Sequence, residues 1–332
     1  YPAMCRYVRL LHERNPDGRW REMTGCIQAG DWLSTVDEAA LEQLKEVVAT
    51  AQLSYSTATL SDTARVLGND DDAAAFADLA AHSRSAFVTH YVNNDGTIVP
   101  DVQSSYLFAL AYDLLPEVER LPAFNRLVDD LERHAGNLTT GLAGTFLFPA
   151  VLSEFGRPDL FLALLRKRNY PSWGYMLERG ATTIWERWNS RHDETGFAST
   201  GMNSFCHPAL CSVGYWLFSA VAGIDQTEES AGFKEILLNP QVAGLLDWAE
   251  ASYRSIHGRI ESRWKKTEEQ FAWDVAIPPN TTAILHIPLG ERKTVRIDDT
   301  PVSEAANTLA VKYTGNRCIV RIEPGKYRIV SV

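Results

Sequence analysis

The sequence lacks the features that mark several large classes of protein. A membrane-spanning helix needs roughly 20 apolar residues in a row, and the longest such run here, YWLFSAVAGI at 215–224, is about half that long. Basic residues are in deficit, with 32 Lys and Arg against 42 Asp and Glu and a net charge of −10. Because phosphate backbones and anionic lipids are bound through clustered Lys and Arg, we expect neither a nucleic-acid partner nor a membrane partner.

Motifs that hold cofactors or metals are also missing. The sequence contains no GxGxxG, P-loop, GxSxG or HExxH pattern, so we expect no cofactor and no metal. Cysteines are few, odd in number and without metal-ligand spacing. They are Cys5, Cys26, Cys206, Cys211 and Cys318. We expect reduced, buried thiols, which slightly favour a cytoplasmic location.

What is present first is a long helical pattern, from residue 2 to about 224. Apolar residues recur there at three- and four-residue spacing, with turn residues between the segments. After a helical start, the predicted helices cover 37–68, 69–91, 106–115, 120–135, 144–155, 157–168 and 205–222. About eight helices with short connections predict antiparallel hairpins. An α/α toroid, a bundle and a solenoid would each bury their apolar faces, and the pattern does not choose among them.

The pattern changes to strands at about residue 232. Alternating or β-branched runs follow one another there at intervals of about eight to twelve residues, which is typical of a small β-sandwich. The segment TEESAG at 227–232 is the predicted linker. We therefore predict two domains, a helical domain over 1–226 and a β-sandwich over 232–332.

Aromatic residues gather in the predicted loops of the helical domain. Four of the nine tryptophans lie there rather than on helical stripes: Trp32, Trp173, Trp185 and Trp188. Aromatic faces beside carboxylates and a histidine suit a sugar, whose ring hydrogens stack on the rings while its hydroxyls form hydrogen bonds. A packed core that contains a salt bridge is the competing interpretation.

Two carboxylates near these tryptophans could take part in glycoside hydrolysis, which needs two carboxyl groups flanking the scissile bond. Glu186, between Trp185 and Trp188, is the best single candidate, although a salt bridge to Arg187 or Arg191 would explain it equally well. Asp31, in the segment GDW, could be the second carboxyl. It could instead be the N-cap of a helix that begins near Leu33, a position that Asp favours.

A single histidine lies close to the same cluster. His207 precedes a proline in MNSFCHP, at 202–208. Without a second histidine at ligand spacing it is not a predicted metal ligand. It is either a structural histidine or part of a sugar site.

Several longer stretches together resemble one enzyme family. They are HAGNLTTGLAGTFLFPAVLSEFGRPDLFLALL, YPSWGYMLERGATTIWERW, MNSFCHPALCSVGYWLFSAVAGI and IPPNTTAILHIP. This sequence is similar there to the catalytic and carboxy-terminal domains of bacterial α-L-rhamnosidases, which are inverting glycosidases with an (α/α)6 toroid. The resemblance covers essentially all 332 residues. It implies a mainly α fold, an apparently incomplete toroid, followed by a small β-sandwich.

The resemblance also implies roles for individual residues. Glu186 would be the general base that activates water, and His207 would hydrogen-bond rhamnose hydroxyls. Trp32 would pack against the sugar, with Asp31 beside it, and Trp173 and Trp185 would be further walls of the pocket. The implied partner is a carbohydrate, a terminal α-L-rhamnoside, and no cofactor is needed.

One part of the family pattern has no match. The family's general acid, a glutamate, lies in a motif of the form RDERxGWxGD, which this sequence does not contain. The chain would then be the carboxy-terminal part of a longer enzyme, a rhamnose-binding pseudoenzyme, or a chain whose site another chain completes. An open ring would expose apolar helix faces, which predicts self-association or a missing N-terminal part that closes the ring.

Overall fold

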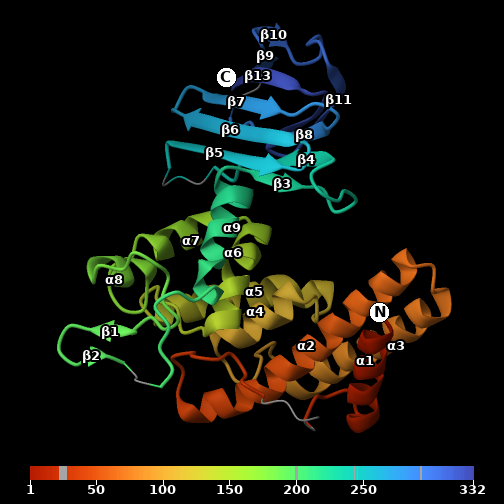
Figure 1. Ribbon diagram of the computed structural model, residues 1–332, viewed down its shortest axis with the longest axis vertical. Coiled ribbons are helices and arrows are strands. Elements are labelled where there is room, and N and C mark those ends of the chain that lie inside the picture. Colours follow the sequence, from red (N-terminus) through yellow and green to blue (C-terminus); the bar gives the residue numbers. More distant parts are fainter. Residues whose placement is uncertain (22–27, 199–200, 243, 245, 292–293) are drawn as a thin grey trace. The chain divides into compact units, whose positions relative to one another are not determined.

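The computed structural model describes residues 1–21, 28–198, 201–242, 244, 246–291 and 294–332 (Figure 1). It divides into two compact units. Unit 1 comprises Tyr1–Phe155 and Leu164–Leu210, and unit 2 comprises Gly156–Ala163 and Cys211–Val332. Unit 1 is helical and unit 2 is dominated by sheets, so the predicted order of a helical region followed by a sandwich is confirmed.

Unit 1 opens with three helices that pack side by side: α1 (Pro2–Arg14), α2 (Glu38–Val66) and α3 (Asp70–Tyr91) (Figure 1). The predicted bounds of the second and third are confirmed within two residues. Asp37 caps α2, because its side chain accepts a hydrogen bond from the Ala40 N–H at 2.8 Å. Gly68, with φ +73°, allows the reversal that leads into α3.

The next helices of unit 1 are α4 (Gln103–Ala111), α5 (Glu117–Arg133), α6 (Leu142–Glu154) and the short α8 (Trp173–Glu178). Helix α4 ends earlier than the prediction of 115. Asp113 adopts φ +53°, a left-handed conformation that stops a helix. Helix α8 was not predicted, so Trp173 lies at its first position rather than in a loop. A short hairpin, β1 (Arg191–His192) with β2 (Gly196–Phe197), follows it.

Three helical segments belong wholly or largely to unit 2. They are α7 (Pro158–Leu165), α9 (Ser212–Trp216), which follows a 3-10 turn at Ala209–Cys211, and the π-helix η2 (Leu217–Val221). The prediction of one helix from 205 is wrong at its start. The backbone before Ala209 is not helical, because the His207 N–H bonds to the carbonyl of Ile184 instead.

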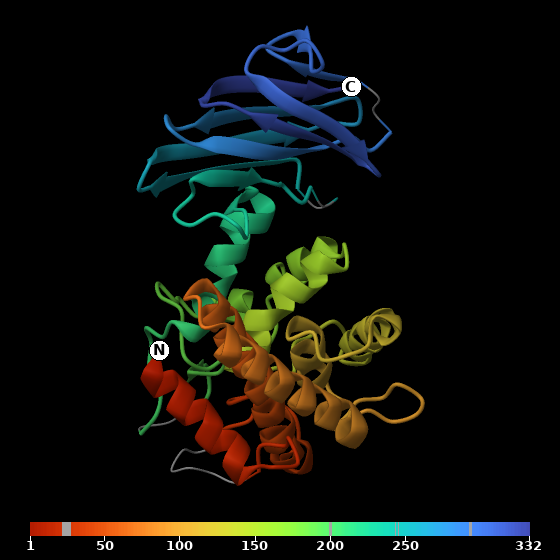
Figure 2. The same cartoon turned by 90° about the vertical axis from the view of Figure 1, so that its right-hand side faces the viewer.

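The strands of unit 2 form two sheets that lie face to face (Figure 2). Among the described residues the first sheet has the order β10 (Thr300–Pro301), β9 (Val295–Ile297), β13 (Gly325–Ser331), β7 (Phe271–Ile277), β6 (Gly258–Lys266), β5 (Trp248–Ser255). The second has the order β11 (Thr308–Thr314), β12 (Arg317–Ile322), β8 (Thr282–Pro288), β4 (Glu235–Leu238), β3 (Ile224–Gln226). The predicted β-sandwich is confirmed.

The segment predicted as a linker has a different role. β3 and β4 are antiparallel neighbours in the same sheet, with Ile224 opposite Leu238. Residues 227–232 therefore connect two strands of the sandwich, which begins before 232.

The core of the sandwich is built by the inward positions of alternating strands. Trp264 and Trp273 are fully buried between the sheets. Each indole N–H has a partner, the Val221 carbonyl at 2.7 Å and the Ser262 hydroxyl at 2.9 Å. Ser262 in turn donates to the Ala222 carbonyl at 2.6 Å. Buried donors are thus satisfied, which holds the residues around 221–222 against the first sheet.

Two further observations concern thiols and hydropathy. The prediction of buried cysteines holds for Cys5 and Cys318 and is wrong for Cys206 and Cys211, which are exposed because they lie in surface turns. These four described cysteines form no disulfide, and Cys26 lies outside the described residues. Of the helices in the described ranges, none combines the length and apolar character that crossing a bilayer requires.

Candidate functional site

Two loop segments of unit 1 that are far apart in sequence run antiparallel to each other. The His207 N–H donates to the Ile184 carbonyl at 2.9 Å, and the Glu186 N–H donates to the Ser204 carbonyl at 2.9 Å. The Ser204 N–H also donates to Oε2 of Glu186 at 2.9 Å. The separation of 21 residues between Glu186 and His207 therefore corresponds to a paired backbone, which brings the two predicted site residues into one region.

Glu186 lines a cleft of about 410 Å³, a size suited to a small ligand. Glu186 is nevertheless largely buried, with only 8% of the residue exposed. One side of the cleft comes from the loop after Trp32 and the start of α6, and the other comes from the segment around Glu186. The lining residues are Leu33, Ser34, Thr35, Gly141, Leu142, Tyr170, Glu186, Arg187, Trp188 and Asn189.

The salt bridge that competed with a catalytic role for Glu186 is not formed. Arg187 donates from Nε to the Met202 carbonyl at 3.0 Å, and Arg191 donates to the Arg179 carbonyl at 3.1 Å. Among the described residues, the Glu186 carboxylate has one hydrogen-bond donor, the Ser204 N–H on Oε2. Its second oxygen, Oε1, is left for water or a ligand.

Asp31 is wholly buried and binds the beginning of α6. Oδ2 accepts from the Ser104 hydroxyl at 2.6 Å and from the Gly141 N–H at 2.7 Å, and Oδ1 accepts from the Gly144 N–H at 2.9 Å. Burial raises the pKa of Asp31, while the hydrogen bonds from Gly144, Ser104 and Gly141 oppose that shift. A carboxylate at a helix N-terminus is favoured by the free N–H groups and the helix dipole.

Both alternatives for Asp31 need correction. No helix begins near Leu33, which adopts a left-handed φ of +66°. The next helix, α2, starts only at Glu38 and is capped by Asp37. The Asp31 carboxylate caps α6 instead, and its relative exposure is 0%. It therefore presents no oxygen to the cleft, and a direct contact with a sugar is not what the geometry supports.

The contact between the Asp31 loop and α6 depends on two glycines. A Cβ on Gly144 would lie 2.4 Å from Oδ2 of Asp31, and a Cβ on Gly141 would lie 2.2 Å from the Trp32 carbonyl oxygen. That carbonyl accepts from the Leu142 N–H at 2.8 Å. Only glycine permits so close an approach. The loop that supplies one wall of the cleft is thus held against α6.

The predicted aromatic walls are placed unequally. Trp32 is 41% exposed, next to lining residue Leu33. Trp173 and Trp185 are buried and do not line the cleft; the Trp173 indole donates to the Leu210 carbonyl at 3.1 Å. Trp188 packs edge-on against Trp173 at 4.9 Å between ring centroids and does line it.

One aromatic lining residue, Tyr170, was not predicted from the sequence. Tyr170 lines the cleft and is 41% exposed. Its ring packs edge-on against Tyr175, with 5.6 Å between centroids. In the sequence Tyr170 begins the stretch YPSWGYM. The one feature of the sequence that could have indicated a role in binding is that it is a further aromatic residue close to the tryptophans.

His207 is half-buried, and its ring is oriented by its own turn. Nδ1 accepts from the Ala209 N–H at 3.3 Å, so in the neutral ring the proton lies on Nε2. In the described parts of the chain, no three His, Cys, Asp or Glu side chains are grouped as a metal ion would need.

Comparisons with known proteins agree with this layout. Residues 1–221 match the model of the bacterial α-L-rhamnosidase six-hairpin glycosidase domain, and residues 223–300 match that of the bacterial α-L-rhamnosidase C-terminal domain. The chain belongs to the bacterial α-L-rhamnosidase family. The predicted fold class, helices of the six-hairpin toroid type followed by a β-sandwich, is confirmed with the family.

Relatives and solved structures support the assignment. An α-L-rhamnosidase of Streptomyces avermitilis is 38% identical over 86% of this chain and 27% of its own length. One of Formosa agariphila is 33% identical over 90% of this chain and 32% of its own. The crystal structure of the S. avermitilis α-L-rhamnosidase complexed with L-rhamnose matches with a TM-score of 0.88 and 33% identity, over 99% of this chain and 30% of that one.

A second solved structure has the same layout at lower identity. The structure of the α-L-rhamnosidase from Dictyoglumus thermophilum matches with a TM-score of 0.87 and 28% identity. The match covers 100% of this rhamnosidase-family chain and 36% of that chain. The chain thus spans about a third or less of the relatives it matches.

Proposed function

We propose that this chain carries the rhamnose-binding cleft and the general base of an α-L-rhamnosidase. In the proposed reaction a terminal α-L-rhamnose is removed from an oligosaccharide or glycoside with inversion at the anomeric carbon. The observation that carries the proposal is the position of Glu186, a carboxylate that accepts from the Ser204 N–H and lines a cleft of about 410 Å³.

The way in which Glu186 is held supports the proposed role of base. Oε2 accepts from the Ser204 N–H, which fixes the carboxylate plane, and Oε1 can take a proton from a water molecule in the cleft. That water attacks the anomeric carbon on the face opposite the leaving group, which is how an inverting glycosidase works.

Binding of the sugar would fall to the groups around this carboxylate. Trp188 and Tyr170 line the cleft, and Trp32 lies at its edge with a partly exposed ring. Apolar ring faces suit the hydrogens and the methyl group of rhamnose. His207, whose backbone N–H bonds to the Ile184 carbonyl near this carboxylate, would hydrogen-bond a hydroxyl of the sugar. Asp31 would act as a positioning residue that holds the Trp32 loop. Trp173 and Trp185 would pack beneath the residues that line the cleft, without contacting the sugar.

The second carboxyl of the reaction would come from outside this chain. In the lining of the cleft, as far as the structure describes it, Glu186 is the only carboxylate. Inverting glycosidases need an acid about 6.5–9.5 Å from the base. We propose that a preceding part of a longer protein, or another chain, supplies it.

Hydrolysis of an aryl α-L-rhamnoside tests the base. The parent and its Glu186→Gln variant are compared, each alone and within a longer protein that includes the family's acid motif. The kcat of the Glu186→Gln variant should be at least about 10²-fold lower than that of the parent. For the parent, NMR should show β-L-rhamnose as the first product, because inversion converts the α-glycoside into the β-sugar. Near-parent activity of Glu186→Gln would remove Glu186 from the role of base.

A second candidate function is suggested by the single carboxylate of the cleft. The chain could bind rhamnose without turnover. Calorimetric titration with L-rhamnose separates the two: saturable binding without hydrolysis in every context supports the binding module, and an absence of binding rejects both.

A further inference from the structure

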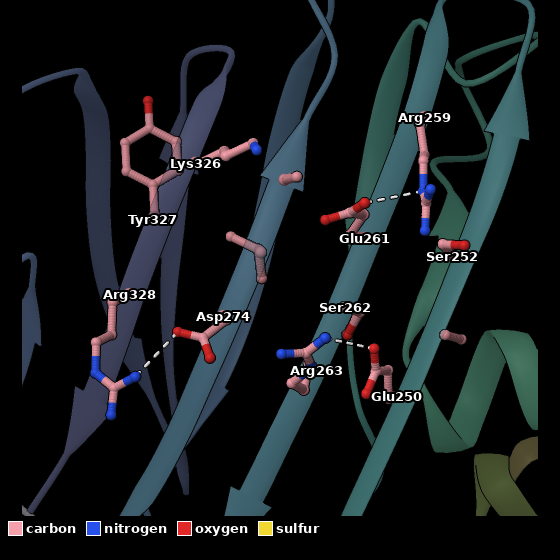
Figure 3. Close-up of a pocket in the computed structure, with 13 residues that line it drawn as sticks. Glu250, Ser252, Arg259, Glu261, Ser262, Arg263, Asp274, Lys326, Tyr327 and Arg328 are labelled. Carbon is pink, nitrogen blue, oxygen red and sulfur yellow. Dashed lines mark hydrogen bonds and ion pairs between the residues drawn. The ribbon is translucent and has the colours of Figure 1, made fainter.

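The outer face of the first sheet in unit 2 carries a hollow lined by charged side chains. Its volume is about 550 Å³, within the range of ligand pockets. Four cations and three carboxylates line it, on strands β5, β6, β7 and β13 (Figure 3). They are Arg259, Arg263, Lys326, Arg328, Glu250, Glu261 and Asp274.

Strand register explains why these charges share one face. Glu250 lies opposite Arg263, Arg263 opposite Asp274, and Asp274 opposite Arg328. Because side chains alternate between faces along a strand, every second residue on each strand joins the same surface. The result is a row of alternating charge across four strands.

This face is basic in a chain that is acidic as a whole. Three more cations occupy outward positions of the same sheet: Arg254, Lys265 and Arg296. Together with the lining residues, the strands of this face carry seven cations and three carboxylates at outward positions. The whole chain, by contrast, has 32 basic and 42 acidic residues. Such a local reversal of sign attracts an anionic ligand.

The ion pairs within the hollow are weak enough to be exchanged. Arg263 lies 2.5 Å from Glu250, Arg259 lies 2.8 Å from Glu261, and Arg328 lies 3.3 Å from Asp274. In all three pairs each side chain is at least about four-tenths exposed. Exposed pairs of this kind contribute little to stability, because water and salt screen their attraction. Lys326 forms no ion pair with any residue that the structure describes. The guanidinium and ammonium groups can therefore turn to a ligand carboxylate at little cost.

An aromatic residue lies on the same face. Trp248 is opposite Lys265 in the register and is 64% exposed. An exposed indole beside cations and carboxylates is suited to stacking on a sugar ring, with hydroxyls donating to the carboxylates of the hollow.

We propose that this face is a second carbohydrate-binding site, specific for an oligosaccharide that carries carboxylate groups. Ligand carboxylates bind to Lys326, Arg328 and Arg263. Sugar hydroxyls donate to Glu261 and Asp274, and Trp248 stacks on a ring at the edge. The three protein carboxylates interrupt the basic surface and disfavour a continuous polyphosphate. The site is separate from the rhamnoside cleft and does not depend on hydrolysis there.

Calorimetric titration with a short oligogalacturonate tests the proposal. Saturable binding is expected at low salt, and it should weaken strongly at about 0.5 M salt because exposed charges are screened. The fully methyl-esterified form of the same oligosaccharide, which keeps the hydroxyls and loses the charge, should bind at least about tenfold more weakly. L-rhamnose should not compete, which keeps this result distinct from the cleft.

Variants place the ligand on this face. Lys326→Gln with Arg328→Gln should weaken binding by about tenfold or more, and Trp248→Ala by about threefold or more. Lys312→Gln removes an equal, exposed charge on β11 of the other sheet and should leave binding unchanged. Unaltered thermal unfolding would show that the variants fold.

Three results of the experiments with the oligosaccharide would overturn the proposal. They are an absence of saturable binding to oligogalacturonate, equal affinity for its ester, and an equal loss in Lys312→Gln and the double variant. An oligoglutamate of matched charge is the last control. If it binds as tightly as the oligosaccharide, the face binds acidic protein segments and the saccharide assignment is wrong.

Discussion

The N–H of Ser204 donates to Oε2 of Glu186 at 2.9 Å, and the N–H of Glu186 donates back to the Ser204 carbonyl at 2.9 Å. This reciprocal pair holds the side chain of Glu186 through the backbone of another loop. The carboxylate therefore has a fixed direction although it lies in a segment without helix or strand.

The length of the residue 186 side chain should matter as much as its charge. Glu186→Asp keeps a carboxylate but withdraws it by one methylene, so it cannot both accept from Ser204 and reach the same water. We expect kcat for an aryl rhamnoside to fall by about 10²-fold, the effect of a misplacement near 1 Å. Glu178→Asp, at an exposed carboxylate at the end of α8 that pairs with Arg168, is the control and should be neutral.

The contact of Asp31 with α6 should be sensitive to a single methyl group. Gly144→Ala places a Cβ 2.4 Å from Oδ2 of Asp31, which must push the loop and α6 apart. We expect the free energy of unfolding to fall by about 1–3 kcal/mol, and rhamnose binding to weaken with the loss of one cleft wall. Gly214→Ala, in α9 with open space around its Cβ, should be neutral or stabilising by up to about 1 kcal/mol. Urea unfolding measures the stability of both variants. An equal loss of stability in Gly144→Ala and Gly214→Ala would contradict the role of Asp31.

Tyr170 should contribute to ligand binding, and Trp173 to stability. Tyr170→Ala removes an exposed ring from the cleft and should raise the Kd for L-rhamnose by about tenfold. Trp173→Phe removes the donor to the Leu210 carbonyl, which should cost about 1 kcal/mol of stability and leave the Kd within about threefold. The reverse pattern in calorimetry and thermal unfolding would show that the sugar lies elsewhere.

Stability should fall in mild acid because of a buried histidine. Burial lowers the pKa of His12 to about 4, with His82 as a second cause, and its Nε2 lies 3.0 Å from the Thr57 hydroxyl. The unfolded chain, with a His pKa near 6.5, binds a proton that the folded chain excludes. The stability is therefore complete above about pH 6.5 and decreases as the pH falls toward 4, by up to about 1.4 kcal/mol per pH unit. Urea unfolding at several pH values should show a shallower slope in His12→Gln than in the exposed control His90→Gln.

Self-association stays a prediction, and α1 offers the surface for it. Met4, Tyr7 and Leu10 lie on one side of that helix and are 50%, 43% and 37% exposed. We expect light scattering to show a mass above the monomer at micromolar concentration, and Met4→Gln with Leu10→Gln to lower it. Val66→Gln, at an exposed apolar residue near the end of α2, should not change the mass.

Periodicity predicted most of the helices and strands, because each element is stabilised by burying one face. The apolar spacing of 37–68 and 69–91 produced α2 and α3 nearly to the residue, and alternation produced the strands of the sandwich. Local patterns failed where a distant segment decides the backbone. Residues 205–208 are not helical because His207 pairs with Ile184, and 227–232 joins two strands because β3 and β4 pair.

The sequence by itself determined the composition of the candidate site: a carboxylate among aromatics, a histidine 21 residues later, and a family resemblance that the comparisons confirm. Only the tertiary structure decided which side chains reach the cleft. It turned Asp31 to the start of α6, buried Trp173 and Trp185, and placed Tyr170 and Trp188 at the surface of the cleft. The reason is physical: side-chain type follows from the sequence, but orientation and burial depend on hydrogen bonds and close contacts between residues as distant as Asp31 and Gly144.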